Sequence, residues 1–326
     1  MSLVVHLLQP PDEGSLAHLQ AHLLPSIQLS LGSELPSDRN VDVLVAGRPK
    51  REHLAACPDL QALIIPFAGV PKETCDLMKE FPQISVHNLH YNAAATSEMA
   101  LALLLAAAKF LLPIDRALRA NDWTPRYKPN PALLMENKTV LVLGYGAIGK
   151  RVARACLGLG MRVKVLRRAG NEIESDSEVE VHPSDKLHQL LPETEVLFVC
   201  LPLTSETEGL IDKHALDLLP ERAILVNVAR GPIVNESALY EALMDGSLYA
   251  AGLDVWYSYP EDESTRSKTA PSQFPFHELD NVVMSPHRAG GTMELEFRRM
   301  ETLADLLNTA AGGEPMPNSV DISLGY

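Results

Sequence analysis

The sequence predicts an α/β protein built from two doubly wound parallel sheets, and three observations carry this prediction. Short apolar runs of strand length alternate with longer amphipathic stretches along most of the chain. The chain has 326 residues, which is enough for two separate cores. A glycine-rich turn begins only at residue 144, so the long segment before it must fold as a unit of its own.

The segment before the glycine turn is expected to form a small parallel sheet of the flavodoxin-like kind. Strands are expected at residues 3–8, 41–46, 62–66 and 84–88, and a helix at residues 15–24. Residues 98–112 are rich in alanine and leucine and apolar on most faces. This stretch predicts a helix buried between layers or domains.

The glycine-rich turn Gly144-Tyr145-Gly146-Ala147-Ile148-Gly149 follows an apolar strand at 140–143 and opens an amphipathic helix that ends near residue 159. A second strand is expected at 161–166. In a Rossmann unit the first glycine permits a tight turn, the second admits the pyrophosphate, and the third lets helix and strand pack closely. The phosphates then lie at the helix N-terminus. Although G-x-G-x-x-G alone is weak evidence, its place in this order predicts a dinucleotide site.

Two arginines, Arg167 and Arg168, stand at the end of the second strand, where NAD enzymes usually carry an acidic residue for the ribose 2′-hydroxyl. Without that acid a 2′-phosphate is not repelled, and planar guanidinium groups attract it. We therefore expect NADP(H) to be preferred, with NAD(H) possible. The alternative is that both arginines are solvated residues at a strand end.

The alternation of strands and helices continues after the arginine pair. Strands are expected at 196–201, 223–228, 252–255 and 281–284, and helices at 236–244 and 293–311. The last helix could return to the first domain. We therefore expect a discontinuous substrate domain, residues 1–105 and 290–326, and a Rossmann domain, residues 106–289. The alternating acids between 172 and 180 suggest a solvated loop or a sheet edge.

The overall composition argues against several classes of binding partner. The formal net charge of −14 argues against a nucleic-acid partner. The four cysteines show no metal-ligand spacing, so we expect reduced thiols and no metal site. The longest apolar run, residues 99–108, is too short to span a bilayer, and the N-terminus lacks a basic leader. A cytoplasmic protein without a membrane partner is expected.

Two polar residues follow expected strands at the edge where ligands bind in such sheets. Arg230 follows the strand at 223–228, and His287 follows the strand at 281–284. An arginine can clamp a carboxylate, and a histidine titrates in the range useful for proton transfer. Taken singly, Arg230 could be a surface ion pair and His287 a capped loop residue.

Further motifs connect these residues to a known family. They are Phe67-Ala-Gly-Val70, Asn92 to Glu98, Cys200-Leu-Pro-Leu-Thr204 and Ala251-Gly-Leu-Asp-Val255. With the glycine turn, Arg230 and His287, they resemble the D-isomer-specific 2-hydroxyacid dehydrogenase family, which includes glyoxylate/hydroxypyruvate reductase, phosphoglycerate dehydrogenase and formate dehydrogenase. The resemblance covers nearly the whole chain, with Thr96-Ser97 where the family usually has Val-Ala.

The resemblance implies a role for each site residue. Arg230 would bind and polarise a 2-oxo acid, and His287 would donate the proton while the nicotinamide delivers hydride. Backbone amides of Ala68, Gly69 and Val70 would hold the substrate carboxylate, unless this segment is a plain glycine turn. Asp254 would orient the nicotinamide carboxamide, or else cap a loop. The cofactor set implied beside the glycine turn and the arginine pair is Leu201, Pro202, Thr207, Val228, Ala229, Asp254 and His287.

The sequence departs from the family at Tyr259, where the family normally has a glutamate that pairs with the histidine. A carboxylate beside an imidazole favours its protonated form, and tyrosine brings no charge at neutral pH. Three interpretations stay open: Glu261 or Glu263 replaces the carboxylate, Tyr259 hydrogen-bonds His287 in a working reductase, or the chemistry is altered or lost.

The leading hypothesis is an NADPH-dependent reductase of small 2-oxo acids such as glyoxylate or hydroxypyruvate. The alternatives are a nucleotide-sensing interaction protein of the same fold and a hydride-transfer enzyme without proton transfer, resembling formate dehydrogenase. The resemblance also implies a homodimer, with residues 123–133 as a contact.

Overall fold

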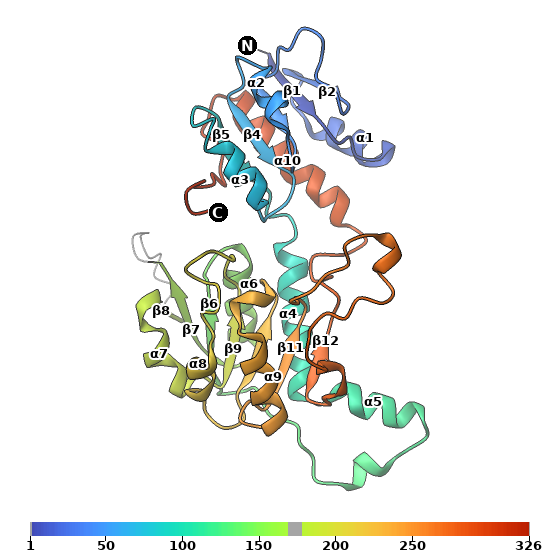
Figure 1. Ribbon diagram of the computed structural model, residues 1–326, viewed down its shortest axis with the longest axis vertical. Coiled ribbons are helices and arrows are strands. Elements are labelled where there is room, and N and C mark those ends of the chain that lie inside the picture. The colour runs from blue at the N-terminus through green and yellow to red at the C-terminus, as the bar shows by residue number, and fades with distance from the viewer. Residues whose placement is uncertain (1, 169–177, 326) are drawn as a thin grey trace. The chain divides into compact units, whose positions relative to one another are not determined.

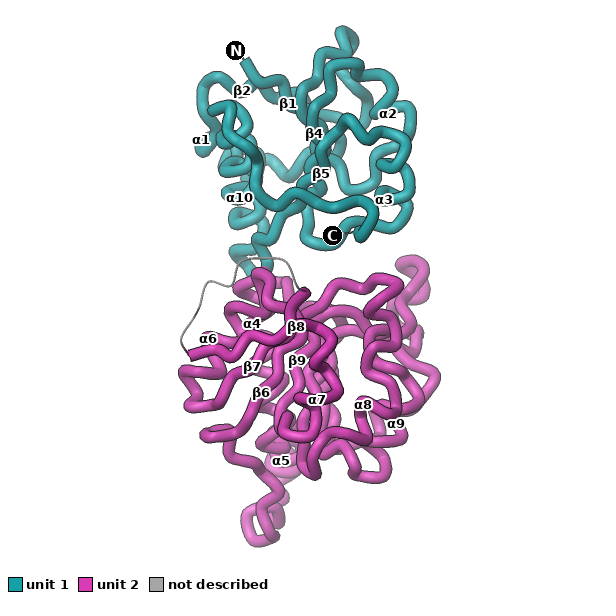
Figure 2. The backbone as a smooth tube through the Cα atoms, turned by 90° about the vertical axis from the view of Figure 1, so that its left-hand side faces the viewer, with its two compact units in different colours: residues 1–92, 292–326 teal, residues 93–291 magenta. Residues whose placement is uncertain are grey.

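The computed structural model describes residues 2–168 and 178–325, which divide into two compact units. Unit 1 comprises residues 1–92 and 292–326, and unit 2 comprises residues 93–291 (Figure 2). The sequence placed the first division at 105, inside what is one helix, α4 (Ala93–Ala108). The division falls at residue 92 because α4 packs as a whole against the strands and helices of unit 2.

Unit 1 contains a five-stranded parallel sheet with the order β2-β1-β3-β4-β5. This is the flavodoxin-like order, which the sequence predicted. The strands are β1 (Leu3–Leu7), β2 (Ile27–Leu31), β3 (Val43–Val45), β4 (Ala62–Ile65) and β5 (Ser85–Asn88). Only β2 was not expected from the sequence. It is an edge strand that pairs with β1 alone and buries none of its residues completely, so its apolar pattern is weak.

Helices cover both faces of this sheet (Figure 1). They are α1 (Glu13–His22), α2 (Arg51–Ala55), α3 (Lys72–Met78) and α10 (Leu295–Ala311). Leu19 of α1 and Leu307 of α10 belong to the core on one face, and Leu54 of α2 and Met78 of α3 belong to the core on the other. The last helix of the chain therefore completes the first unit.

Unit 2 contains a seven-stranded parallel sheet with the order β12-β11-β10-β9-β6-β7-β8. The strands are β6 (Thr139–Leu143), β7 (Arg162–Arg167), β8 (Val179–Pro183), β9 (Val196–Val199), β10 (Ile224–Asn227), β11 (Ala250–Leu253) and β12 (Val282–Met284). The chain winds from β6 outward to β8 and then from β9 outward to β12. The direction of winding therefore reverses between β6 and β9, and the predicted doubly wound Rossmann sheet is confirmed.

Side chains of β6 alternate between two cores, because successive residues of a strand point to opposite faces. Val140 and Val142 belong to the core with α4 and α6, and Leu141 and Leu143 to the core with α7, α8 and α9. These helices are α6 (Ala147–Gly158), α7 (Leu187–Leu190), α8 (Lys213–Asp217) and α9 (Glu236–Asp245). Short 3₁₀ turns are η1 (Thr124–Tyr127), η2 (Ser184–Lys186), η3 (Leu191–Glu193), η4 (Gly231–Ile233), η5 (Glu263–Thr265) and η6 (Phe276–Glu278).

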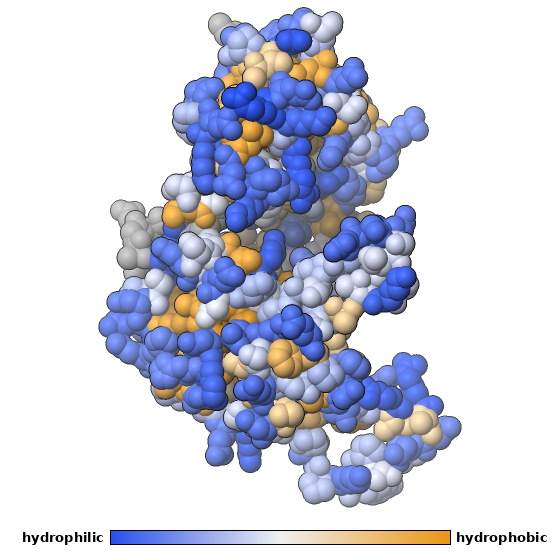
Figure 3. All heavy atoms as spheres, in the orientation of Figure 1, coloured by the Kyte–Doolittle hydropathy of each residue, from blue (hydrophilic) through white to orange (hydrophobic). Residues whose placement is uncertain are grey.

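The helix expected at 98–112 is wrong at its C-terminal end. Here α4 ends at Ala108, Phe110 adopts φ +50°, and a separate helix α5 (Leu111–Arg119) starts at an angle of 69° to α4. No residue of α5 is buried, and Figure 3 shows apolar residues among hydrophilic ones on this arm of unit 2. Within the described residues no single helix is long and apolar enough to span a membrane, and α4 and α5 meet that criterion only when joined across the bend.

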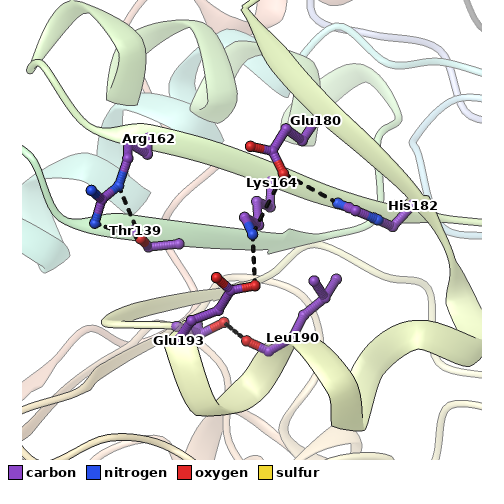
Figure 4. Close-up of polar contacts among 8 residues, drawn as sticks. Thr139, Arg162, Lys164, Glu180, His182, Leu190 and Glu193 are labelled. Carbon is purple, nitrogen blue, oxygen red and sulfur yellow. Dashed lines mark hydrogen bonds and ion pairs between the residues drawn. The ribbon is translucent and has the colours of Figure 1, made fainter.

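The edge of the sheet at β7 and β8 is held by charged side chains (Figure 4). Lys164 Nζ lies 2.6 Å from Glu193 Oε1 and 3.4 Å from Glu180 Oε2. The lysine is only 14% exposed, so the two carboxylates compensate a largely buried charge. Among the alternating acidic residues between 172 and 180, Glu180 lies on the edge strand β8, which agrees with the sheet-edge interpretation. Residues 172–177 lie outside the described residues.

Candidate active site

The three glycines of the turn between β6 and α6 differ in the space around them. Only Gly146 has room for an added Cβ, and this is the glycine at which a ligand would approach. A Cβ on Gly149 would lie 1.9 Å from the Gly144 carbonyl oxygen, and a Cβ on Gly144, which has φ +95°, would lie 2.7 Å from the Cys200 carbonyl oxygen. A Cβ on Gly146 would meet nothing within 4 Å. Gly146 also caps α6 without any side-chain hydrogen bond to the first turn. The turn therefore fits a pyrophosphate at the helix N-terminus.

The turn lies where the winding of the sheet reverses. Leu201 and Pro202 follow β9, the neighbour of β6, and the Leu201 side chain lies against Gly144. Thr207 orders this loop, because its hydroxyl donates to the Pro202 carbonyl oxygen at 2.6 Å and accepts from the Thr204 amide at 2.8 Å. In doubly wound sheets such a reversal point is where nucleotides bind.

The arginine pair ends β7, the other neighbour of β6. Arg167 is the last residue of that strand and is partly buried, and Arg168 follows it on the surface. Because all strands are parallel, both residues lie at the same carboxyl edge as the glycine turn. In Rossmann folds this edge carries the group that contacts the adenosine ribose.

A rigid turn presents Arg230 after β10. The buried Asn227 donates from Nδ2 to the Arg230 carbonyl oxygen at 3.0 Å and accepts the Ala229 amide at 3.0 Å. A Cβ on Gly231 would lie 2.3 Å from the Trp256 carbonyl oxygen, so only glycine lets this turn pack against the loop after β11. The exposed guanidinium of Arg230 is thus carried on a backbone that is fixed from both sides.

Asp254 holds the loop that carries His287. This carboxylate is completely buried, and it accepts hydrogen bonds from the Ser285 hydroxyl at 2.5 Å and from the amides of Arg288 and Ala289 at 2.9 Å each. The His287 amide donates to the Asp254 carbonyl oxygen at 2.7 Å. His287 itself adopts φ +56°, a conformation that non-glycine residues rarely hold without such support. The loop-capping interpretation of Asp254 is therefore what these contacts describe, and its contact with the nicotinamide stays a prediction.

Tyr259 lies beside His287, with ring centroids 5.5 Å apart and the planes inclined by 57°. Its hydroxyl accepts the Trp256 amide at 3.1 Å, and no hydrogen bond joins it to His287 in the described part of the chain. Glu261 is exposed, and Glu263 pairs with Arg266 at 2.7 Å, so neither shows a contact with His287 among the described residues. The described geometry thus provides His287 with a neutral ring as its neighbour.

Electrostatics at His287 favour the neutral imidazole. Partial burial lowers the pKa of His287, and the nearby positive charge of Arg230 lowers it further, whereas Asp254 acts in the opposite direction. Burial likewise raises the pKa of Tyr259, so the phenol is uncharged at neutral pH. The positive charge of Arg230 acts against the rise in the pKa of Tyr259.

Unit 1 carries the predicted substrate segment, residues 68–70, directly after β4. The buried Asn88 donates from Nδ2 to the Ala68 carbonyl oxygen at 2.6 Å, which fixes this loop to the end of β5. Among the described residues, the amides of Ala68, Gly69 and Val70 donate to no other protein group. Free amides of this kind can bind an anion.

The side chains of Val228 and Ala229 are buried, so these two residues offer only backbone atoms to a ligand. Sequence reasoning missed the supporting residues Asn227, Trp256 and Ser285. Trp256 Nε1 donates to the Ser285 carbonyl oxygen at 2.8 Å and so ties the loops after β11 and β12 together. A polar residue at the end of an apolar strand, as at Asn227, was the available signal.

The fold and this site together define a dinucleotide-binding α/β protein with an arginine and a histidine at the sheet edge. Comparison with known proteins gives the family. Residues 101–289 match the model of the D-isomer specific 2-hydroxyacid dehydrogenase NAD binding domain. This chain belongs to the D-isomer specific 2-hydroxyacid dehydrogenase family, which confirms the resemblance seen in the sequence.

Individual relatives agree with this assignment. Glyoxylate/hydroxypyruvate reductase B of Pectobacterium carotovorum is 31% identical over 277 residues, which are 84% of this chain and 83% of the relative. Glyoxylate reductase of Korarchaeum cryptofilum is 36% identical over 231 residues, 69% of this chain and 65% of the relative. The match thus spans slightly less than two thirds of that relative. A D-isomer specific 2-hydroxyacid dehydrogenase from Xanthobacter autotrophicus, solved with NADPH and MES, is similar over the full length of both chains, with a TM-score of 0.81 and 27% identity.

Proposed function

We propose that this protein reduces a small 2-oxo acid of the glyoxylate or hydroxypyruvate type to the D-2-hydroxy acid with NADPH. One observation carries the proposal: Arg230 follows β10 and His287 follows β12, so that both lie at the carboxyl edge of the nucleotide-binding sheet. The glyoxylate reductases among the relatives support the choice of substrate class.

In this proposal each residue has a defined role. Bound nicotinamide supplies the hydride that adds to the substrate carbonyl carbon. Arg230 donates hydrogen bonds to the carbonyl oxygen and the carboxylate, and it stabilises the negative charge that develops on that oxygen. Protonated His287 transfers its proton to the same oxygen, which yields the hydroxyl group. The family resemblance assigns carboxylate binding to the free amides of residues 68–70 in unit 1.

The lowered pKa of His287 has a consequence for catalysis. Above that pKa most free enzyme holds a neutral imidazole, which cannot give a proton. A bound substrate carboxylate adds negative charge and raises the histidine pKa again. The proton donor is therefore restored mainly in the substrate complex.

The cofactor preference rests on Arg167 and Arg168 at the end of β7. Two guanidinium groups there offer charge-assisted hydrogen bonds to a 2′-phosphate. The NADPH in the Xanthobacter relative agrees with this preference. NADH is expected to serve with lower affinity.

We further propose a homodimer through the arm of residues 111–127, which contains α5, η1 and the residues between them. This arm exposes large apolar side chains, which single soluble domains seldom gather on one element. They include Leu111 at 54%, Leu118 at 48%, Trp123 at 60% and Tyr127 at 79% exposure.

The test is a panel of short 2-oxo acids assayed for NADPH and NADH oxidation in parallel. We expect turnover with glyoxylate or hydroxypyruvate and a higher kcat/KM with NADPH. Absence of turnover with every acid, while the protein still binds NADPH, would overturn the proposal in favour of a nucleotide-sensing role.

A second candidate is hydride transfer without proton transfer, as the formate dehydrogenase resemblance implies. It is favoured by the hydroxyl of Tyr259, which bonds the Trp256 amide rather than His287. This candidate predicts a rate that hardly depends on His287 protonation. A kcat/KM that falls tenfold for each pH unit above the His287 pKa would exclude it.

A further inference from the structure

A histidine pair on α1 and a carboxylate on α10 lie together on the surface of unit 1, apart from the residues discussed so far. His18 and His22 are one helical turn apart on the same face, with ring centroids 4.4 Å apart. His18 Nε2 lies 3.2 Å from Glu301 Oε1. One nitrogen of each ring and one oxygen of Glu301 lie within 4.8 Å of one another, and no other His, Cys, Asp or Glu group of three does so among the described residues.

The distance between His18 and Glu301 matches that between two ligands of a metal site. Zinc binds imidazole nitrogen at about 2.0–2.1 Å and carboxylate oxygen at about 2.0–2.2 Å, so two such ligands in a tetrahedral site lie roughly 3.3–3.5 Å apart. The 3.2 Å between His18 and Glu301 is close to this value. His22 is exposed, and its ligand nitrogen lies within 4.8 Å of the other two ligand atoms. Two imidazoles and one carboxylate suit zinc rather than magnesium or calcium, which prefer oxygen ligands.

Neighbouring contacts already hold the ligands in position. His22 Nδ1 donates to the His18 carbonyl oxygen at 2.8 Å, which leaves the lone pair of Nε2 available to a metal. Asn308 of α10 donates to the His22 carbonyl oxygen at 2.9 Å and accepts the Leu24 amide at 2.9 Å. The end of α1 is therefore fixed to α10 two turns beyond Glu301.

Charge at the site is compatible with a cation. Arg298 lies 3.4 Å from Glu301 Oε2 and is 71% exposed, so it neutralises only part of the carboxylate and leaves Oε1 toward the histidines. The hydrogen between His18 Nε2 and Glu301 Oε1 would be replaced by the metal. A water can complete the four ligands, because the group lies at the surface.

We propose that His18, His22 and Glu301 form a zinc site that clamps α1 to α10. The clamp joins the first helix of the chain to the last one, which together cover one face of the unit 1 sheet. Its effect is structural, since a ligand that binds only the folded protein stabilises it by mass action.

The test is calorimetric titration of Zn²⁺ into the full chain after treatment with a chelator and removal of any affinity tag. We expect one zinc per chain, and His22→Gln and Glu301→Gln should each weaken binding at least about tenfold, because even loss of an outer partner costs 10–100-fold. The matched control is His214→Gln. It removes one ring of the His188–His214 pair, whose centroids are 5.3 Å apart and which forms no such three-ligand group among the described residues.

Hydrogen exchange provides a second readout that does not depend on affinity. Zinc should slow amide exchange in α1 and α10 of the wild type and leave exchange unchanged in His22→Gln, which keeps its fold because the side chain is exposed. The proposal is overturned if the wild type binds no zinc. It is also overturned if His22→Gln binds zinc as tightly as His214→Gln does, because the metal then lies elsewhere.

Discussion

Replacing Tyr259 by glutamate should restore a charged partner to His287 and shift the pH profile of reduction upward. The two rings are 5.5 Å apart. At about that distance opposite unit charges interact by roughly 3 kcal/mol at an effective dielectric constant of about 20 and by roughly 0.8 kcal/mol in water. Tyr259 is 45% exposed, so screening moves the value toward the lower limit. One pKa unit corresponds to about 1.4 kcal/mol, and we therefore expect the pKa of His287 to rise by about one unit.

The assay is kcat/KM for 2-oxo acid reduction from about pH 5 to 9, which reports ionisations of the free enzyme. Reduction requires protonated His287, so the rate is high below the histidine pKa and falls as the pH rises through it. In the wild type this fall should begin below the ordinary histidine pKa of 6.5, because burial and Arg230 lower the value. In Tyr259→Glu the fall should move about one unit higher. Tyr259→Gln is the neutral control, and identical profiles for the two variants would refute the reasoning.

Three further outcomes are expected. Replacing Arg167 and Arg168 together by glutamine should raise the Kd for NADPH about 10–100-fold and hardly change the Kd for NADH, because charge-assisted hydrogen bonds contribute about 1.5–3 kcal/mol. Fluorescence titrations measure both Kd values. Equal losses of affinity for the two nucleotides would show that the arginine pair is only solvated. Gly149→Ala should lose about 3 kcal/mol or more of unfolding free energy because its Cβ would overlap a backbone oxygen, whereas Gly146→Ala should lose less than about 0.5 kcal/mol and yet bind NADPH more weakly. Chemical denaturation and nucleotide titration separate the two, and equal stabilities would contradict the packing argument. Trp123→Glu should raise the dimer dissociation constant about 30-fold or more in sedimentation experiments, because a central aromatic contact contributes about 2 kcal/mol to binding. An unchanged dissociation constant would show that the dimer uses another surface.

The sequence predicted the strands that are buried on both faces, because such strands read as short uninterrupted apolar runs. Strand β2 was missed because an edge strand needs no such run. The break at Phe110 could not be seen, since an apolar pattern continues across it from α4 into α5. Only the surrounding packing, which buries α4 and leaves α5 exposed, places the bend there.

The residues proposed to carry the chemistry could be recognised in the sequence from their place after strands. The residues that hold them in position could not. The three hydrogen bonds to Asp254 come from residues more than thirty positions away. No local sequence pattern can therefore predict these bonds. From the sequence, the hydroxyl of Tyr259 could bond either His287 or the Trp256 amide. The conformation of the folded loop determines that it bonds the Trp256 amide. The His18–Glu301 contact spans 283 positions, and for this reason the sequence suggested no metal site.

The placement of α10 sets an order for the formation of the two units. Unit 2 is one continuous segment, residues 93–291, and every strand of its sheet is available before α10 has been synthesised. Unit 1 depends on α10 for Met300, Leu303 and Leu307 on one face of its sheet. During synthesis, that apolar face of the N-terminal sheet therefore stays uncovered until α10 has been made. In this period the sheet is exposed to aggregation and to chaperones.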